Sequence, residues 1–125
     1  MLIAIVAFII ALTLLLLYLF PIVVVCGDSM LPTYHDGDIM VGSRLPILFK
    51  SPLKVEDVYV YMPPSYEAEQ RFVIKRLVFI NDEGKRFFEG DNPPQSYDSR
   101  MYGYINRSRV VAHCLFTIKK RKEKS

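Results

Sequence analysis

The chain has 125 residues, of which 51% are apolar and 23% are charged, and its formal net charge is +3. The charges are unevenly distributed, because residues 1–26 contain no Asp, Glu, Lys, Arg or His. This distribution argues against a wholly soluble globule, and the high apolar content argues against a disordered chain. The sequence has no second apolar run of membrane-spanning length, which argues against a polytopic membrane protein.

Residues 2–20 make up one apolar run that predicts a membrane-spanning helix. Nineteen residues at 1.5 Å per residue reach about 28 Å, close to the roughly 30 Å hydrocarbon core of a bilayer. A cleavable signal peptide is the alternative, but it would have a basic start, a shorter apolar core and a small-residue cleavage site. The sequence therefore favours an uncleaved anchor over residues 1–26. No Lys or Arg precedes the run, so the positive-inside rule does not set its orientation.

The positive charge is concentrated in the basic tail at residues 119–125, which carries five basic side chains and one acidic side chain. A local tail of this kind does not mark a nucleic-acid-binding domain. We expect it to be a solvated terminus, and attraction to anionic lipid headgroups is the alternative. Cys26 and Cys114 are too few for a disulfide framework or a metal site. Two free thiols are expected, with a single disulfide as the alternative.

From residue 27 onward, short runs rich in Val, Ile, Phe and Tyr alternate with Gly, Pro and Asp, a pattern typical of β-strands separated by turns. They predict one small all-β domain over residues 27–118. The segment Asn-Asp-Glu-Gly at residues 81–84 predicts a hairpin turn. The expected strands cover residues 38–44, 56–62, 71–80, 86–89 and 109–118.

The apolar run Leu-Pro-Ile-Leu-Phe at residues 45–49 follows the first of these expected strands. Two interpretations stay open for it. It is either a loop that covers the core, or a surface loop that enters the bilayer interface beside the anchor, where Leu and Phe are favourable.

Lys75 is the first candidate for chemistry. In an alternating strand it shares a face with Val73, Leu77 and Phe79, which are all apolar. Burial disfavours the charged ammonium and lowers a lysine pKa. A neutral amine can accept the proton of a hydroxyl and act as a general base. Taken alone, the pattern more often indicates a lysine at a sheet edge or one whose head group reaches solvent.

Ser29 is the second candidate. It lies in a turn-rich segment directly after Gly27 and Asp28. A glycine before a serine lets backbone N–H groups converge on one point, as an oxyanion hole requires. Serine is common in loops, so the combination of Ser29 with Lys75 carries more weight than either residue alone.

Several stretches of the chain resemble type I signal peptidases, which are membrane-bound serine proteases with a Ser/Lys dyad. The order of these stretches and the position of the anchor also agree with that family. Only 14 residues separate Lys75 from Gly90, so the resemblance implies a mainly β catalytic domain of minimal size, without a large accessory β-domain. The matching stretches are Gly-Asp-Ser-Met-Leu-Pro-Thr at 27–33, Gly-Asp-Ile-Met-Val at 37–41, Lys-Arg at 75–76, Gly-Asp-Asn at 90–92 and Ser-Tyr-Asp-Ser-Arg at 96–100.

The resemblance implies a role for each matching residue. Ser29 would be the nucleophile, and Lys75 would be the general base that later protonates the leaving amine. The Ser29 backbone N–H would supply one oxyanion donor. Gly27 stands where some members of the family carry a serine that supplies a second donor. Met30 would form part of the wall of the substrate pocket.

Three further residues would support the dyad. Ser96 would hold the amine of the dyad by a hydrogen bond, and Asp98 with Arg100 would form a structural ion pair behind the site. Some relatives use His as the base, but neither His35 nor His113 stands at the corresponding position. Both histidines are expected to be structural or surface residues. The resemblance implies no metal and no other cofactor.

The resemblance implies a membrane-anchored serine endopeptidase that cleaves signal peptides from exported preproteins through an acyl-enzyme ester. Its partners would be preprotein signal peptides and the lipid bilayer, and not nucleic acid. An extended peptide would bind by adding a strand to a sheet edge. The domain would lie on the trans face of the plasma (inner) membrane, with an organelle inner membrane as the alternative. A dedicated peptidase for one pilin- or conjugation-type substrate, and a non-catalytic assembly factor on the same fold, stay open.

Overall fold

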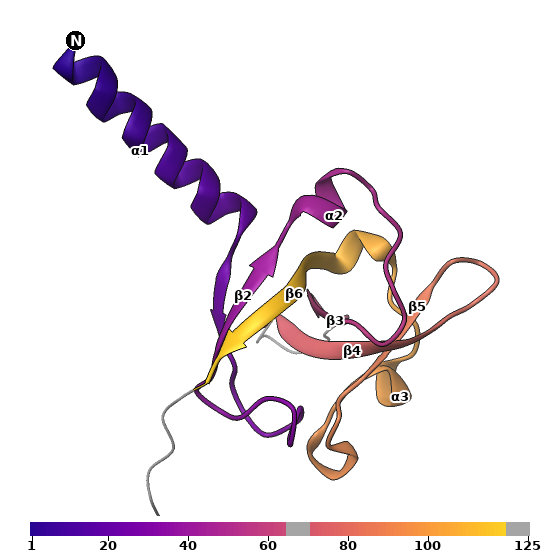
Figure 1. Ribbon diagram of the computed structural model, residues 1–125. Coiled ribbons are helices and arrows are strands. Elements are labelled where there is room, and N and C mark those ends of the chain that lie inside the picture. The colour runs from indigo at the N-terminus through magenta and orange to yellow at the C-terminus, as the bar shows by residue number, and fades with distance from the viewer. Residues whose placement is uncertain (65–70, 120–125) are drawn as a thin grey trace, which may run out of the picture.

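The structure is a computed structural model that describes residues 1–64 and 71–119. The helix α1 (Leu2–Leu19) extends away from a curled β-sheet (Figure 1). None of its residues is buried, and its length and apolar composition suffice to cross a membrane. The helix ends just before Pro21, which cannot continue an α-helix. The structure thus has the apolar helix that the first residues of the sequence predict.

The rest of the described chain is one six-stranded sheet in the order β1-β2-β6-β3-β4-β5, with every neighbouring pair antiparallel. This architecture confirms the predicted mainly β domain behind one N-terminal helix. The strands are β1 (Ile22–Val24), β2 (Ile39–Ser43), β3 (Val58–Tyr61), β4 (Val73–Ile80), β5 (Arg86–Glu89) and β6 (Val110–Ile118). The short helical turns are α2 (Leu45–Leu48), η1 (Pro93–Gln95), α3 (Ser99–Tyr102) and η2 (Arg107–Arg109).

Strand β1 is an element that the sequence pattern did not predict. The sequence predicts that the anchor continues to residue 26, whereas the structure pairs Ile22–Val24 with β2. Three consecutive β-branched residues favour a strand once the helix has ended. The segment that leads to Ser29 therefore begins within the sheet, directly after the helix.

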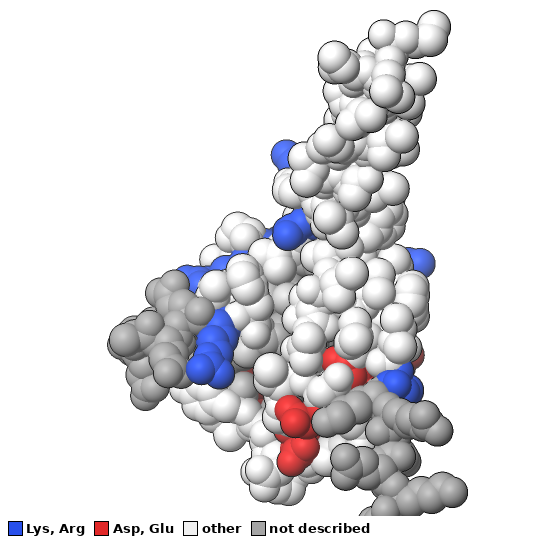
Figure 2. Space-filling view, turned by 90° about the vertical axis from the view of Figure 1, so that its left-hand side faces the viewer, with Lys and Arg blue, Asp and Glu red and all other residues white. Residues whose placement is uncertain are grey.

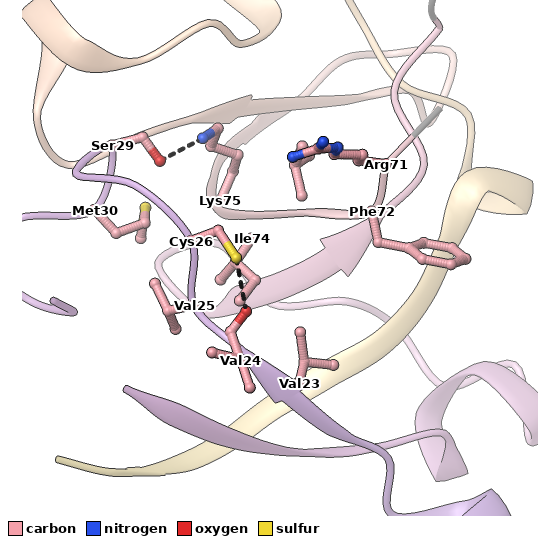
Figure 3. Close-up of a pocket in the computed structure, with 11 residues that line it drawn as sticks. Val23, Val24, Val25, Cys26, Ser29, Met30, Arg71, Phe72, Ile74 and Lys75 are labelled. Carbon is pink, nitrogen blue, oxygen red and sulfur yellow. Dashed lines mark hydrogen bonds between the residues drawn. The ribbon is translucent and has the colours of Figure 1, made fainter. Parts of the chain in front are cut away.

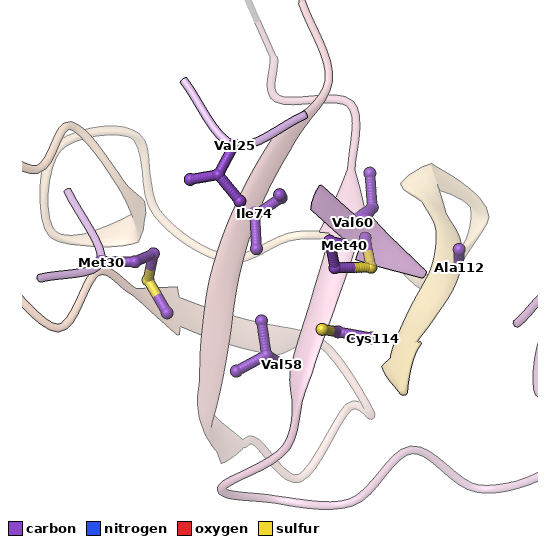
Figure 4. Close-up of a cluster of buried hydrophobic side chains, with 8 residues drawn as sticks. All are labelled: Val25, Met30, Met40, Val58, Val60, Ile74, Ala112 and Cys114. Atoms are coloured by element: carbon purple, nitrogen blue, oxygen red, sulfur yellow. The ribbon is translucent and has the colours of Figure 1, made fainter. Parts of the chain in front are cut away.

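The core consists of two clusters that lie on opposite faces of β3. All four residues of β3 are buried, because Val58 and Val60 enter the first cluster while Tyr59 and Tyr61 enter the second. Figure 4 shows the first cluster between the strands. Its other members are Val25, Met30, Met40, Ile74, Ala112 and Cys114, and the second cluster adds Leu53, Leu77, Phe88, Ile105 and Val110.

The apolar run at residues 45–49 forms the short helix α2 and its last turn rather than a loop. Pro46 stands in the first turn, where its missing N–H costs nothing. Ile47 packs against the second core cluster, whereas the Leu48 and Phe49 side chains are 48% and 76% exposed. The run therefore covers the core with one side chain and presents two others to the surroundings.

The end of α1 is bonded directly to β2 and to the residue after it. The Gly42 N–H donates to Pro21 O at 2.8 Å, and the Arg44 N–H donates to Leu19 O at 2.8 Å. Arg44 Nε also donates to Tyr18 O at 2.7 Å, and its guanidinium lies over the Tyr18 ring. These bonds satisfy carbonyls that a helix end leaves without partners. The domain is thereby joined to the foot of α1 without a linker.

Candidate active site

The loop between β1 and β2 carries Ser29. It is closed at its base by Val25 N–H to Asp38 O and by Gly37 N–H to Val25 O, both at 2.8 Å. Met30, the next residue after Ser29, is only 1% exposed and anchors the loop in the first core cluster. The chain thus places a serine on a loop that a buried neighbour holds in position.

Lys75 lies in β4, where it pairs with Tyr59 of β3, and it is only 5% exposed. Its Nζ donates a hydrogen bond to Ser29 Oγ at 2.6 Å (Figure 3). The structure therefore brings together the two residues that the sequence proposes as a dyad, although 46 positions separate them. A hydroxyl and a buried amine at this distance are within reach for transfer of a proton between them.

The surroundings of Lys75 lower its pKa below the ordinary lysine value of 10.5. Burial is the largest cause, and the positive charge of Arg100 acts in the same direction, while the negative charge of Asp98 opposes them. When the amine is neutral, its lone pair can accept the proton of the Ser29 hydroxyl. The site is therefore suited to proton abstraction at lower pH than a solvated lysine would allow.

The sequence predicts three apolar residues on the face of β4 that carries Lys75, and the structure has two of them there. Val73 and Leu77 belong to the second core cluster, as simple alternation requires. Phe79 is 53% exposed, because the register with β5 shifts between Leu77 and Phe79 and reverses the faces beyond that point. The alternation that identified Lys75 thus holds on either side of it and ends at the bulge.

Asp98 lies at the centre of the supporting network and is completely buried. Its carboxylate accepts bonds from the Gly90 N–H at 2.8 Å, from Ser96 Oγ at 2.5 Å and from Arg100 Nη2 at 2.6 Å. Burial alone would raise the pKa of Asp98, but these donors together hold it well below its usual range. Asp98 and Arg100 form an ion pair, and its supporting role towards the dyad stays a prediction.

The Ser96 hydroxyl is oriented differently from what we expect from the resemblance. It donates to Asp98, and among the described residues the Lys75 amine donates to Ser29 rather than to Ser96. Ser96 nevertheless lies against the site, because a Cβ added at Gly90 would stand 2.2 Å from Ser96 Oγ and 2.6 Å from the Ser29 carbonyl oxygen. A supporting role of Ser96 towards the amine stays a prediction.

Arg76 and Asp91 form a second network that the sequence analysis missed. Asp91 accepts two bonds from Arg76, at 2.9 Å and 2.8 Å, and a third from Thr33 Oγ1 at 2.5 Å. The Arg76 bonds are the largest cause of the lowered pKa of Asp91. Because Arg76 follows Lys75 and Thr33 lies on the Ser29 loop, this network fixes the loop against β4. The sequence signal for this network was that Arg76 directly follows Lys75 and that Asp91 lies in the matching stretch at 90–92.

Asn92 adds backbone contacts to the same loop. Its N–H donates to Ser29 O at 2.9 Å, and its side-chain Nδ2 donates to Asp28 O at 2.9 Å. Within residues 1–64 and 71–119, no group accepts a hydrogen bond from the Ser29 N–H. Gly27, at φ +85°, has open space where a side chain would begin. The Ser29 N–H is therefore free to act as an oxyanion donor.

A cavity of about 220 Å³ opens beside the dyad (Figure 3). It is lined by residues 23–26 from β1 and its continuation, by Ser29 and Met30, and by residues 71–75 at the start of β4. β1 is an edge strand of the sheet, and β5 pairs only with the part of β4 from Arg76 onward. The cavity thus lies between β1 and residues 73–75 of β4, and each of these two segments has one edge without a strand partner among the residues that the structure describes.

The remaining candidates lie outside this arrangement. His35 contacts Asp38, and His113 Nε2 lies 3.1 Å from Asp57 Oδ2. The two thiols are free, as expected, with Cys26 exposed in the wall of the cavity and Cys114 buried. The described part of the chain contains no group of three His, Cys, Asp or Glu side chains that could hold a metal ion.

Comparison with known proteins gives one informative relative. No family model matches the chain. The chain is 26% identical over 132 aligned residues to a protein of Synechocystis sp. named probable signal peptidase I-1, and the match covers 72% of this chain and 66% of the relative. Because the aligned length exceeds the 125 residues of this chain, the relative has extra residues inside the matched region. The chain is thus similar, at low identity, to a protein named as a signal peptidase.

Proposed function

We propose that this chain is a membrane-anchored serine endopeptidase of the signal peptidase I type, which uses Ser29 and Lys75 to remove signal peptides from exported preproteins. The observation that carries the proposal is the 2.6 Å contact between Ser29 Oγ and the buried Lys75 Nζ at the wall of a cavity. The similarity to a protein named signal peptidase I-1 supports the choice of substrate class.

The reaction is an acyl transfer in two stages. As Ser29 Oγ forms a bond to the scissile carbonyl carbon, its proton passes to the neutral Lys75 amine and the negative charge moves to the carbonyl oxygen, near the Ser29 N–H. The carbon–nitrogen bond then breaks, and the Lys75 ammonium returns the proton to the leaving amine. Water attacks the resulting ester and gives its proton to Lys75, and Ser29 leaves with that proton.

The strand edges beside the cavity suit an extended substrate. A peptide laid between residues 23–26 and residues 73–75 can form backbone hydrogen bonds with either edge, as in strand addition. Its side chains would alternate between the cavity floor and solvent. The walls are mostly apolar, so the residues that enter the cavity should be small and apolar. Met30 and Cys26 limit its depth on the side of the loop.

The placement of the domain supports action at the membrane surface. Three strands next to α1 carry apolar residues on their outer face, in two rows of cross-strand neighbours, Val24–Ile39–Ile118 and Ile22–Val41–Phe116. All of these residues are exposed except Val41, which is half-buried. In Figure 2, the surface directly below α1 is mostly uncharged, Lys and Arg lie along its margins, and Asp and Glu lie towards its lower end, away from α1. We propose that this face rests on the bilayer, on the trans side of the plasma (inner) membrane, where signal peptides emerge.

The test is cleavage of candidate preproteins by the purified full-length chain, with the new N-termini identified by mass spectrometry. Ser29→Ala should abolish cleavage, and Lys75→Ala should lower the rate by roughly 10²–10⁴-fold, the usual contribution of a general base. The matched controls Ser108→Ala and Lys85→Ala alter exposed residues and should keep full activity.

The outcome also separates the alternative functions. Cleavage of one substrate among many would favour a dedicated processing peptidase. Binding of preproteins without any cleavage by the unmodified chain would favour an assembly factor and would overturn the proposal. Full activity in the Lys75→Ala variant would exclude Lys75 as the base.

A further inference from the structure

The surface around α2 combines exposed apolar side chains with an excess of basic side chains. Leu48 ends α2 and Phe49 follows it, and both side chains are exposed, although Ile47 of the same helix packs against the second core cluster. The sequence has no acidic residue between Asp38 and Glu56, whereas it has Arg44, Lys50 and Lys54 there. Lys50 and Lys54 are both exposed. An amphipathic surface of this composition is typical of segments that lie in the interface of an anionic bilayer.

A pair of arginines extends the basic surface on the other side of α2. Arg107 Nη2 donates to Pro46 O of α2 at 2.9 Å, and Arg107 lies close enough to Arg86 to lower its pKa, after the larger effect of burial. The Arg86 Nε is the one buried side-chain nitrogen or oxygen without a hydrogen-bond partner in the described part of the chain. Two neighbouring guanidinium groups concentrate positive charge, which favours the approach of an anion to their exposed nitrogens.

The position of α2 relative to α1 decides which anion is within reach. Arg44, which precedes α2, is bonded to Tyr18 O and Leu19 O at the end of α1. Figure 1 shows α2 at the level of the foot of α1, at the end of β2. When α1 spans a bilayer, this corner of the domain faces the headgroups of the leaflet in which the helix ends.

We infer that the α2 corner, formed by Leu48, Phe49, Lys50, Lys54 and Arg107, is a docking surface for anionic phospholipid headgroups. The two apolar side chains enter the boundary between headgroups and acyl chains, and the basic side chains bind the phosphates around them. This second contact would fix the rotation of the domain about α1. The inference requires α1 to span the membrane and does not depend on the proposed peptidase activity.

The chain contains no tryptophan, so a single substitution creates a specific fluorescent reporter. The full-length Phe49→Trp variant is reconstituted in vesicles of phosphatidylcholine alone or mixed with phosphatidylglycerol, and quenching by lipids brominated in the upper acyl chain is compared with quenching by aqueous iodide. The control is Tyr97→Trp, because Tyr97 is 68% exposed and lies two residues before α3, an element that Figure 1 shows far from α1.

We expect lipid quenching of the Phe49→Trp variant to exceed that of the control roughly twofold or more, and to increase with phosphatidylglycerol. Replacing Lys50 and Lys54 by Gln should lower the docked-to-undocked ratio roughly fivefold for each charge removed, whereas Lys85→Gln should not change it. Equal iodide quenching of the two tryptophan variants would overturn the docking surface. Equal lipid quenching with and without phosphatidylglycerol would overturn its anionic specificity. Neither result bears on cleavage by the dyad.

Discussion

Lys75 is the residue at which stability and function oppose each other. Its pKa is lowered in the folded chain, so the folded state binds the proton less tightly than the unfolded state does. The free energy of unfolding therefore rises with pH between the folded pKa and the ordinary value of 10.5, and it is reduced below that range. A buried amine that destabilises the fold at neutral pH is expected to serve the chemistry of the site.

Replacement of Lys75 by Met should therefore stabilise an inactive protein. Methionine has a similar volume and no charge to bury, so the free energy of unfolding at neutral pH should rise by up to about 1.4 kcal/mol for each unit of pKa depression that it removes. Unfolding of both proteins in detergent micelles, followed by circular dichroism at several pH values, measures this gain. The difference should shrink as the pH rises towards 10.5. A Met variant that is less stable than the parent at neutral pH would contradict the argument.

The pH dependence of cleavage gives a second test at the residue scale. Because the neutral amine is the active form, kcat/KM should rise with pH through an apparent pKa below 10.5. Arg100 lowers the pKa of Lys75, so Arg100→Gln should move this acidic limb to higher pH. Rates for one peptide substrate across the pH range, with Arg109→Gln as a control at an exposed arginine, measure the shift. A limb that does not move, or moves to lower pH, would show that Arg100 does not act on the amine.

At the scale of elements, the close approach of the 90–100 segment to the Ser29 loop is the critical feature. Gly90 does not have a positive φ, so a side chain is excluded there by contact alone. The Cβ of Gly90→Ala would collide with the Ser29 carbonyl oxygen, which is backbone, as well as with Ser96. The two segments must then separate, which should lower stability by about 1–3 kcal/mol and weaken the contact between Ser29 and Lys75.

Gly84→Ala is the matched control for that substitution. Gly84 lies in the β4–β5 turn at φ +79°, and a Cβ there would meet nothing within 4 Å. Its cost is backbone strain of about 1–2 kcal/mol, far from the dyad. Both variants should be less stable in thermal unfolding, but only Gly90→Ala should also lose kcat. Equal retention of kcat in both variants would show that the Gly90 contact does not position the dyad.

Local patterns predicted most of the sheet and part of the site. The five strands expected from alternation appear within two residues of their predicted ends, because each has one face in a core cluster. The sequence did not predict the three-residue β1 or the bulge after Leu77, because neither has a local pattern distinct from its surroundings. The bonds from Asp91 to Arg76 and Thr33 join residues 15 and 58 positions apart, and alternation within one strand carries no information about such partners.

At the scale of the whole molecule, most of the exposed large apolar residues are gathered on α1 and on the parts of the domain next to it. Hydrogen bonds from Gly42 and Arg44 join the end of α1 to β2 and to the start of α2. They thereby connect three apolar regions, which are the helix α1, the outer face of β1, β2 and β6, and the exposed residues of α2. Ser29 follows the end of α1 by ten residues. The proposed contact of the outer sheet face with the bilayer would bring the Ser29 loop, which continues from β1, towards the membrane surface.

Two phenylalanines of similar exposure test whether the outer sheet face contacts lipid. Phe116 lies on that face and is 55% exposed, and Phe79 lies beyond the β4 bulge and is 53% exposed. Both Phe116→Asp and Phe79→Asp should change stability little, because neither side chain is buried. Only Phe116→Asp should slow cleavage of a membrane-embedded preprotein in vesicles, by several-fold, since a carboxylate resists burial in the interface. In detergent with a soluble peptide, both variants should match the parent, which separates membrane contact from damage to the dyad. If Phe79→Asp slows cleavage in vesicles as much as Phe116→Asp does, the outer face is not the surface that meets the bilayer.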